Sequence, residues 1–457
     1  AASLVIKHEI KTEVAPKIKL DVAVAQTFTK ALDFDLTNAQ RKAAWQILQD
    51  MGGDRPMNRL LEGDVGSGKT VVALLAAVMA MKNRYQVVIM VPTDILARQH
   101  HARLSPLLQK LGFKTALVLG RQSAADKKAA LEASADGTAQ FIIGTHALVA
   151  EGVQFHRLGL VVIDEQHRFG VQQRQKLKEK AGRLPHLLSM TATPIPRTLA
   201  LTVYGDLDIS VIDELPANRK PVNTKVIQPR DRMAAYGFID KQLAEGRQAF
   251  VVCPLIEESE ALTSKSVIAE AKRLEEGPFK HRRIGVVHGK LKPAERDGIM
   301  GAFAAGDLDI LVSTNVIEVG IDISNATIML IEGAERFGLA ALHQLRGRVG
   351  RGEHQSYCLV ASDSTAAGVL ERLGALERTS DGFRLAQIDL ELRGPGEIYG
   401  RHQHGMLELD LADLGDTRLV AEVRAAADAF VSESTRMLQY PRIVERINRL
   451  KTVTSLD

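Results

Sequence analysis

The sequence predicts an α/β protein with two parallel-sheet domains in tandem and a small, mainly helical module at the C-terminus. Short apolar runs alternate with amphipathic stretches from about Leu60 to Leu188, and a second series of this kind begins near Lys225. The alternation stops after about Ala361. Continuously apolar runs are typical of strands in a parallel sheet, and the helical stretches between them supply the crossovers.

The first domain is predicted from five apolar runs. Residues 94–111, DILARQHHARLSPLLQKL, are amphipathic and predict a helix between two of the strands. This alternation of strand and helix is typical of βαβ units. The predicted strands lie in residues 85–92 (YQVVIMVP), 114–120 (KTALVLG), 139–145 (AQFIIGT), 159–165 (GLVVIDE) and 186–193 (HLLSMTAT).

The second domain is predicted from six further apolar runs, again separated by helical stretches. The join between the domains is expected in residues 212–224, IDELPANRKPVNT, where Pro216, Pro221 and polar residues interrupt the pattern. The predicted strands lie in residues 225–229 (KVIQP), 248–256 (QAFVVCPLI), 282–289 (RRIGVVHG), 309–314 (DILVST), 326–332 (ATIMLIE) and 356–362 (SYCLVAS).

The two ends of the chain follow different patterns. Residues 364–405 predict two helices followed by a glycine-rich loop. The first thirty-odd residues mix charged and β-branched side chains without a clear core pattern, which predicts a connector from a preceding domain. We therefore expect a connector at residues 1–33, sheet domains at 34–217 and 218–362, and a C-terminal module at 363–457.

Composition favours a globular protein of the cytoplasm with no membrane partner. The chain has 457 residues, of which 45% are hydrophobic. No run approaches the roughly 18 to 20 apolar residues that cross a bilayer, and the first residues lack the apolar core of a signal peptide. Cys253 and Cys358 each lie in an apolar segment, which predicts buried thiols in a reducing compartment.

The net charge of +4 is too small to indicate a polyanionic partner by itself. The distribution of basic residues is more informative. They gather in residues 343–354 (HQLRGRVGRGEH) and recur at Arg372, Arg378, Arg384, Arg393 and Arg401. This clustering predicts a local positive field on one side of the molecule.

A phosphate-binding loop is predicted at residues 63–70, GDVGSGKT, between an apolar pair and an apolar helical run. In the pattern GxxxxGK[ST], glycines let backbone N–H groups surround phosphates, the lysine reaches the β and γ phosphates, and the hydroxyl binds Mg²⁺. The alternative is a glycine-rich turn with an incidental lysine. The candidate nucleotide-binding residues are Gly63, Gly66, Ser67, Gly68, Lys69 and Thr70.

Two acidic residues follow about 95 residues later, at the end of the apolar run LGLVVIDEQH. Asp164 is expected to hold Mg²⁺, and Glu165 to orient and deprotonate the attacking water. Acidic residues at strand ends are often simple turn formers. Together with a phosphate loop, however, they indicate nucleotide hydrolysis at the carboxyl edge of the sheet.

A third element, QLRGRVGR, spans residues 344–351 at the end of the second domain. Guanidinium groups stabilise the charge on a transferring phosphoryl group. Arg348 and Arg351 are therefore candidate arginine fingers across an interdomain cleft, and Gln344 is a further catalytic candidate. An exposed basic helix is the alternative. Glycines at 347, 350 and 352 disfavour it, because glycine is a poor helix residue unless close approach is needed.

With these three elements the chain resembles superfamily two helicases and translocases, whose motor core has two RecA-like domains and uses ATP and Mg²⁺. The resemblance implies that Gln40, in LTNAQ, reads adenine. In STNVIEVGID it implies that Gly320 and Asp322, with Glu318, contact the nucleotide and nucleic acid. The implied DNA-contacting or coupling residues are Pro92, Thr93, Thr145, His146, Thr191, Thr193 and Thr314. A threonine after a strand is also often only a helix cap.

The sequence segments around these motifs make the resemblance more specific. IDEQHRFGVQQR, MTATPIPRTLALTVYGDLDISVIDELP and CPLIEESE resemble RecG-type DNA helicases, which remodel branched DNA at stalled replication forks. Transcription-repair coupling translocases share part of this pattern but typically carry Glu where Gln166 stands. Residues 381–405 resemble the translocation module of both families. That likeness implies roles for Asp389, Arg393, Gly394, Gly396 and Gln403, whereas the alternative is a packed helix pair with a surface loop.

The resemblance has one departure. The family carries an N-terminal wedge domain of oligonucleotide-binding fold, which has no counterpart here. The chain is expected to be a fragment of a longer protein, with a naturally short relative as the alternative. Either case predicts ATPase activity with weakened or lost unwinding of branches.

The sequence thus predicts an ATP-dependent helicase or translocase for replication fork reversal and Holliday junction branch migration in DNA repair and recombination. Its expected partners are branched or duplex DNA and, by resemblance, single-strand-binding protein, and we expect a monomer. Contacts should fall mainly on phosphates and be salt-sensitive. The alternatives are a transcription-coupled translocase, a nucleotide-dependent DNA-binding module and an RNA helicase.

Overall fold

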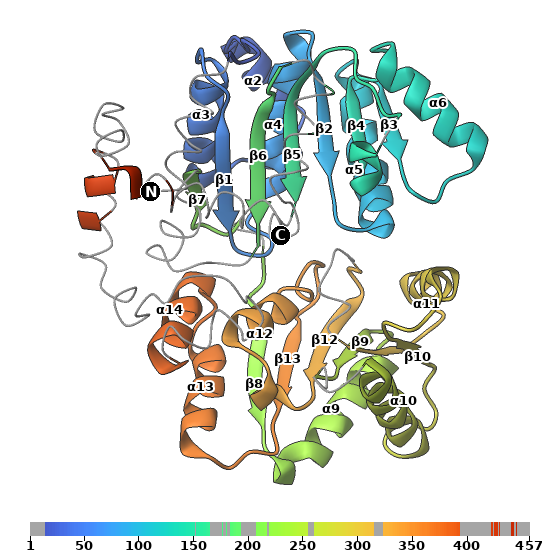
Figure 1. The fold of residues 1–457 in the computed structure, drawn as a ribbon. Helices are drawn as coiled ribbons and strands as arrows, with labels where there is room; N and C mark the ends of the chain where they lie inside the picture. The colour runs from blue at the N-terminus through green and yellow to red at the C-terminus, as the bar shows by residue number, and fades with distance from the viewer. Residues whose placement is uncertain are drawn as a thin grey trace. The chain divides into compact units, whose positions relative to one another are not determined.

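The computed structural model describes residues 14–150, 152–164, 176, 180, 183–192, 207–216, 219–254, 260–314 and 323–393, with short pieces at 422–423, 425–427, 429, 440–442 and 445. The chain divides into two compact units. One covers Ala1–Pro216 together with Arg393–Asp457, and the other covers Ala217–Leu392. Each contains a sheet with helices beside it (Figure 1).

The described part of the first unit contains a seven-stranded sheet in which every paired strand is parallel. The strand order is β3-β4-β2-β5-β6-β1-β7. Nearly every residue of β2, β4, β5 and β6 is buried, which explains why these strands are mostly apolar in sequence. The strands are β1 (Asn58–Gly63), β2 (Gln86–Met90), β3 (Thr115–Val118), β4 (Phe141–Gly144), β5 (Leu158–Asp164), β6 (His186–Thr191) and β7 (Asp208–Ile212).

The helices of this unit begin where the sequence places side-chain caps. Thr37 caps α3 in a reciprocal capping box with Gln40, and Thr93 and Ser123 cap α5 and α6. Helix α4 is apolar around most of its circumference because nearly all of its residues from 72 to 81 are buried. The helices are α2 (Val22–Lys30), α3 (Asn38–Met51), α4 (Lys69–Lys82), α5 (Asp94–Lys110) and α6 (Ala124–Ala135).

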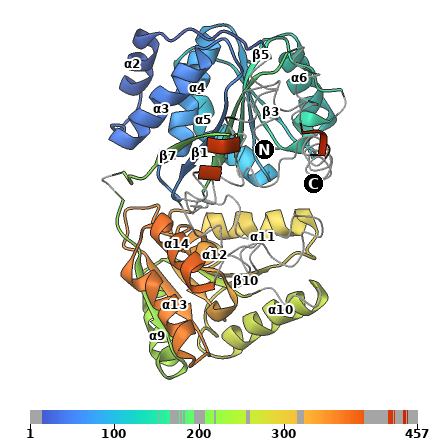
Figure 2. The same cartoon turned by 60° about the vertical axis from the view of Figure 1, so that its left-hand side comes forward.

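The segment from residue 14 to 30, predicted as part of a connector, packs against the first unit. Its backbone pairs with the end of α3 through the Ile18 N–H and the Met51 carbonyl, 3.2 Å apart, and Ile18 is fully buried. Helix α2 follows and packs on α4 (Figure 2), and Phe28 is its buried residue. We call residues 14–21 the strap. Its mixed pattern arises because, from Pro16 to Asp21, buried or half-buried residues alternate with exposed ones.

His186 joins the strap to the sheet from a fully buried position at the start of β6. Its Nδ1 accepts a hydrogen bond from the Met57 N–H at 3.0 Å, and its Nε2 lies 2.7 Å from the Pro16 carbonyl oxygen. The ring is therefore the neutral tautomer with the proton on Nε2. Burial lowers the pKa of His186 to about 4, although the hydrogen bond to Pro16 acts in the opposite direction.

The described part of the second unit contains a six-stranded parallel sheet in the order β10-β11-β9-β12-β13-β8. Both sheets have an order that requires crossovers, as predicted from the alternating pattern. The strands are β8 (Asn223–Ile227), β9 (Gln248–Val252), β10 (Ile284–Val287), β11 (Ile310–Ser313), β12 (Ala326–Ile331) and β13 (Tyr357–Ala361).

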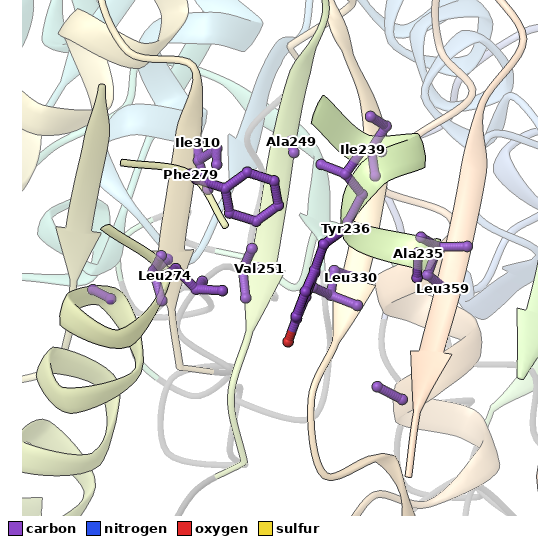
Figure 3. Close-up of a cluster of buried hydrophobic side chains, with 14 of the residues drawn as sticks. Ala235, Tyr236, Ile239, Ala249, Val251, Leu274, Phe279, Ile310, Leu330 and Leu359 are labelled. Atoms are coloured by element: carbon purple, nitrogen blue, oxygen red, sulfur yellow. The ribbon is translucent and has the colours of Figure 1, made fainter. Parts of the chain in front are cut away.

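One core cluster of the second unit lies between the sheet and helices α9 and α10. Phe279 meets Tyr236 edge to face, with ring centroids 5.6 Å apart, next to Val251 and Leu330 (Figure 3). The helices are α9 (Arg232–Ala244), α10 (Glu260–Glu276), α11 (Pro293–Ala305), α12 (Leu339–Arg346), α13 (Ala367–Arg378) and α14 (Gly382–Arg393).

The helices predicted after Ala361 are present as α13 and α14, and α13 packs on β8 and α12. The glycine-rich loop that was expected to follow them lies outside the described residues. Both cysteines are buried thiols, as predicted, and burial raises the pKa of Cys253 and of Cys358 to about 12. Among the described helices, none is both long enough and apolar enough to span a bilayer.

Candidate nucleotide and nucleic-acid site

The predicted site residues of the first unit lie along the carboxyl edge of its sheet. Gly63 ends β1, Asp164 ends β5 and Thr191 ends β6, while Thr93 and Thr145 follow β2 and β4. In the strand register, Asp164 lies opposite Met190, and Met90 lies opposite both Gly144 and Ile163. The strand order therefore places the ends of β4, β2, β5, β6 and β1 in one row, where parallel α/β sheets bind ligands.

The loop between β1 and α4 has the backbone conformation that phosphate binding requires. Gly66 and Gly68 have φ angles of 80° and 86°, which glycine adopts without strain. Gly68 is the N-cap of α4, so the first N–H groups of that helix are directed toward the loop. A side chain at Gly63 would collide with the Ser67 hydroxyl. The loop thus needs glycine at these three predicted positions.

The side chains of the loop fit a nucleotide phosphate. Lys69 Nζ donates to the carbonyl oxygens of Gly63 and Asp64 at 2.7 and 2.9 Å, which holds its ammonium group within the loop. Ser67 is fully buried, and its hydroxyl has no hydrogen-bond partner among the described residues. Thr70 is half-buried in the first turn of α4. The positive end of a helix, an ammonium group and a buried hydroxyl suit an anion.

The side chain of Gln40 is hydrogen-bonded to the backbone of this loop. Its Nε2 donates to the Ser67 carbonyl oxygen at 2.8 Å, and its Oε1 accepts from the Thr37 N–H at 2.9 Å. The side chain is 1% exposed. Here the amide group is engaged within the first unit, and an adenine contact would require it to turn. The adenine role of Gln40 stays a prediction.

Gly68→Ala should weaken ATP binding by about tenfold, because a left-handed backbone costs an alanine about 1 to 2 kcal/mol. The new Cβ would also meet Gln40 Nε2. Titration of a fluorescent ATP analogue measures the change. Gly112→Ala is the matched control, since Gly112 has a φ of 85° with no atom near its missing Cβ. Equal affinity in the Gly68 variant and the unmodified chain would contradict the assignment.

Asp164 lies at the end of β5, and its Oδ2 is 3.9 Å from Nε2 of His100 on α5. Burial, and secondarily the charge of Arg103, lower the pKa of His100 to about 4. The imidazole is therefore uncharged at neutral pH, and the pair is not a salt bridge. Among the described residues no cluster of three His, Cys, Asp or Glu side chains could hold a metal ion. This is compatible with Mg²⁺, which keeps water and phosphate ligands and needs few protein carboxylates.

The threonines expected to touch DNA also have structural partners. Thr93 Oγ1 accepts from the Leu96 N–H at 3.3 Å and caps α5, while Thr145 Oγ1 donates to Asp94 Oδ1 at 3.3 Å. Pro92 is half-buried, and His146 is exposed at the start of a short 3₁₀ helix. Thr191 is buried, as is Thr314 after β11 of the second unit.

The arginine segment of the second unit is not an exposed helix. Helix α12 ends at Arg346, and the chain leaves it through Gly347. Gly350 has a φ of 79°, and a side chain there would meet Val222, while one at Gly352 would meet the Ser324 carbonyl. Close approach therefore explains these glycines, as the sequence suggested. Of the three candidates, Arg348 is buried, Gln344 is half-buried and Arg351 is exposed.

Two of the clustered arginines do not contribute to an exposed positive field, which corrects the prediction from their spacing. Arg346 is buried and donates to the carbonyl oxygens of Leu376 and Thr379 at 2.8 and 2.9 Å. Arg372 is likewise buried and donates to the carbonyls of Glu335 and Phe337. Their guanidinium groups satisfy backbone carbonyls at the end of α13 and in the turn before α12.

Asp389 of α14 is buried, and its Oδ2 accepts from the Leu339 N–H at 3.3 Å, in the first turn of α12. Its negative charge is favourable there, at the positive end of the helix. Arg346 holds the other end of α12 against α13. Helix α12, which leads into the arginine segment, is thus held at both ends by α13 and α14.

Arg346→Met should lower the free energy of unfolding by about 2 kcal/mol, because the carbonyls of Leu376 and Thr379 lose their donor while the buried stem is kept. Urea unfolding followed by circular dichroism measures this. Arg378→Met, at an exposed position in the last turn of α13, should change stability by less than about 0.5 kcal/mol. Equal stability of the two variants would show that Arg346 is not a structural donor.

Several predicted residues lie outside the described part of the chain. Of Arg393, only its place as the last residue of α14 is described. The others are Glu165, Gln166, Thr193, Glu318, Gly320, Asp322, Gly394, Gly396 and Gln403.

The structure adds three residues that the sequence did not single out. Asp94 binds Thr145, and His100 lies beside Asp164. Glu214, in the predicted join, accepts from the Ala39 N–H at 3.1 Å in the first turn of α3. Asp94 could have been noticed in the sequence as the acidic residue that directly follows the Thr93 helix cap. Nothing in the sequence marked His100 or Glu214, because their partners are distant in the chain.

Comparison with known proteins agrees with this geometry. Residues 37–202 match the DEAD/DEAH box helicase family, and residues 234–353 match the helicase conserved C-terminal domain. Residues 379–455 match the C-terminal part of domain 3 of the ATP-dependent DNA helicase RecG.

Curated relatives named ATP-dependent DNA helicase RecG are similar over nearly the whole chain. The protein from Synechocystis sp. is 48% identical over 93% of this chain and 52% of its own length. The protein from Aquifex aeolicus is 46% identical over 95% of this chain and 56% of its own. The chain spans about half the length of these relatives.

A solved structure of RecG bound to a three-way DNA junction superposes with a TM-score of 0.77. It is 42% identical and covers 91% of this chain and 54% of that one. A structure of the helicase MrfA bound to DNA, at 19% identity and a TM-score of 0.59, shares the fold. With three family models in sequence along the chain and relatives nearly half identical, the chain belongs to the RecG helicase family.

Proposed function

We propose that this chain is the motor part of an ATP-dependent DNA helicase that acts on branched DNA in replication fork reversal and Holliday junction branch migration. The observation that carries the proposal is the row of strand ends in the first unit. It places a phosphate loop, an acidic strand end and threonine-bearing turns along one edge of a parallel sheet. Relatives of the chain are helicases, and one of them is bound to a three-way DNA junction.

The chemistry assigned to this edge is phosphoryl transfer from ATP to water, and Mg·ATP supplies the transferred group. Lys69 would exchange its bonds to the Gly63 and Asp64 carbonyls for phosphate oxygens. The N–H groups at the start of α4 and the Ser67 hydroxyl would bind further oxygens. Thr70 and Asp164 would hold Mg²⁺, and Glu165 would orient the water. These assignments fit the position of each described group on the loop or at the strand end.

Charge that develops on the phosphoryl group requires cationic donors, and we propose Arg348 and Arg351 for this role, with Gln344 as a neighbouring polar contact. Gly320 and Asp322 are proposed to contact the nucleotide. Coupling to DNA is proposed for Pro92, Thr93, Thr145, His146, Thr191, Thr193, Thr314, Asp389, Arg393 and Gln403. Binding of single-strand-binding protein, a monomeric state and a cytoplasmic location stay predictions, as do the domain limits given above.

Steady-state ATP hydrolysis tests this function. The unmodified chain is assayed without nucleic acid and with single-stranded DNA, linear duplex and a model fork, while Asp164→Asn measures hydrolysis that does not arise from this site. Stronger stimulation by duplex or fork than by single strands is expected, and it should decline as salt is added because phosphate contacts release counterions. The proposal would be refuted if none of these DNAs changed the rate of ATP hydrolysis and if Asp164→Asn hydrolysed ATP at the same rate as the unmodified chain. Strand displacement on the fork, assayed separately, tests whether unwinding is weakened.

A further inference from the structure

Helix α5 connects two parts of the candidate site that lie on different strands. Its first turn carries Asp94, which binds Thr145 after β4, and Thr93 caps it. Two turns further along, His100 lies beside Asp164 at the end of β5. One helix thus contacts both a proposed DNA-contacting threonine and the proposed Mg²⁺ ligand.

Helix α5 is one continuous helix that is packed on the sheet of the first unit. Ala97 and Leu108 are fully buried against the first unit. His101 and Ser105 both bind the Thr115 hydroxyl, at 3.2 and 2.9 Å, which joins the middle of the helix to β3. The helix packs on β3 and β4 (Figure 1). Asp94 and His100 belong to this one helix, so a change in its tilt would alter the contacts to Thr145 and to Asp164 together.

The distance between His100 and Asp164 is only slightly longer than a hydrogen bond, so a small movement would change their contact. Their Nε2 and Oδ2 atoms are 3.9 Å apart, which is too long for a hydrogen bond. A movement of about 1 Å would form a direct hydrogen bond between these two atoms. Both side chains are largely buried, with 13% of His100 and 18% of Asp164 exposed. The contact can therefore exist in two arrangements that orient Asp164 differently.

We propose that His100 is a positioning residue that orients the Asp164 carboxylate, and that α5 transmits to it the state of the DNA contacts at Thr93 and Thr145. This inference rests on the proposed function and assigns a regulatory path to the same site. DNA that engages the two threonines shifts α5, the distance between His100 and Asp164 changes, and the carboxylate turns toward its Mg²⁺-binding orientation. The histidine takes part in no bond making itself.

The first test compares His100→Ala, His100→Gln and His100→Met. Glutamine keeps a polar hydrogen-bonding group near the place of the imidazole Nε2, whereas methionine fills the space without a comparable donor. The readout is the ratio of ATP hydrolysis rates with and without duplex DNA. We expect alanine and methionine to lower this ratio at least about fivefold, within the usual range of coupling between sites, and glutamine to restore most of it. Equal ratios for glutamine and methionine would overturn the inference, since a space-filling role alone would explain them.

A second readout does not depend on hydrolysis. Binding of a fluorescent ATP analogue is titrated with Mg²⁺, and the concentration for half-maximal binding is compared. His100→Ala should raise it by about tenfold, because an outer partner of a metal-binding carboxylate contributes at least that much to metal affinity. His156→Ala, at an exposed position elsewhere in the first unit, is the matched control and should leave it unchanged. An unchanged midpoint in His100→Ala would overturn the positioning role.

The transmission through α5 is tested by a double-mutant cycle with Asp94→Ala. If α5 carries the coupling, the double variant should reduce the DNA stimulation ratio no further than the more severe single variant. Additive losses would show that the two residues act separately. If DNA does not stimulate the unmodified chain, the DNA-motor proposal fails, and the Mg²⁺ titration alone then decides the role of His100.

Discussion

Lys69→Ala should lower the rate of ATP hydrolysis by about 100-fold or more. The ammonium group is buried within the phosphate loop, where it donates to two carbonyl oxygens and where the N-terminus of α4 supplies further positive potential. Removing one such donor from a site that excludes water costs about 10² to 10³ in rate. The rate is measured by coupled assay at saturating ATP, with and without duplex DNA.

Lys82→Ala is the matched control for this prediction. Lys82 is the last residue of the same helix and is exposed, so its loss changes the charge of the protein equally but leaves the loop intact. It should hydrolyse ATP within about twofold of the unmodified chain. Should the two variants hydrolyse ATP at the same rate, the loop would not be the hydrolytic site, and the wider assignment of a motor would fail with it.

The first unit should lose about 3 kcal/mol of stability between pH 6.5 and pH 4 because of His186 alone. Burial lowers the pKa of His186 from 6.5 to about 4 in the folded chain. Below pH 6.5 the unfolded chain therefore binds a proton that the folded chain does not. Stability is fully present above pH 6.5 and declines as the pH falls toward 4, at about 1.4 kcal/mol per pH unit.

Urea unfolding at a series of pH values measures this loss, and His186→Asn removes the titrating group. The variant should be less stable at neutral pH, because Met57 and Pro16 lose a partner, yet its stability should decline less steeply between pH 6.5 and 4. His146→Asn, an exposed position in the same unit, controls for the loss of a histidine. Parallel pH profiles for His186→Asn and the unmodified chain would rule out the neutral buried histidine.

The strand pattern was predictable from the sequence because a strand buried in a parallel sheet is mostly apolar, as β4 is throughout and as β2 and β5 are except at Gln86 and Asp164 at their ends. The phosphate loop was predictable because its glycines are demanded by the local backbone, which the structure confirms at Gly66 and Gly68. Such local requirements are expressed within a few neighbouring residues. They can be recognised before any long-range contact is known.

Partners that meet only in the folded chain were not predictable in this way. His186 binds Pro16 across 170 positions, and Glu214 binds Ala39 across 175. The charge of Arg346 suggested an exposed surface, whereas burial against the carbonyls at the end of α13 gives it a structural role. The packing of the strap on the first unit was not predicted, because only one face of this extended segment makes the contact. In each case the sequence does not show which distant segments of the chain are in contact in the folded protein.

The regular spacing of strands in the sheet also fixes the distance between the turn after β4 and the loop after β1. Neighbouring strands of a sheet are about 4.8 Å apart, so the four intervals from β4 to β1 span roughly 19 Å. One turn of duplex DNA is about 34 Å long. The turn after β4 and the phosphate loop after β1 are therefore separated by little more than half a DNA turn, and backbone hydrogen bonds set that distance. Substitutions along this edge can change the affinities that we propose for DNA and ATP, but they leave the spacing between the two ends of the row unchanged.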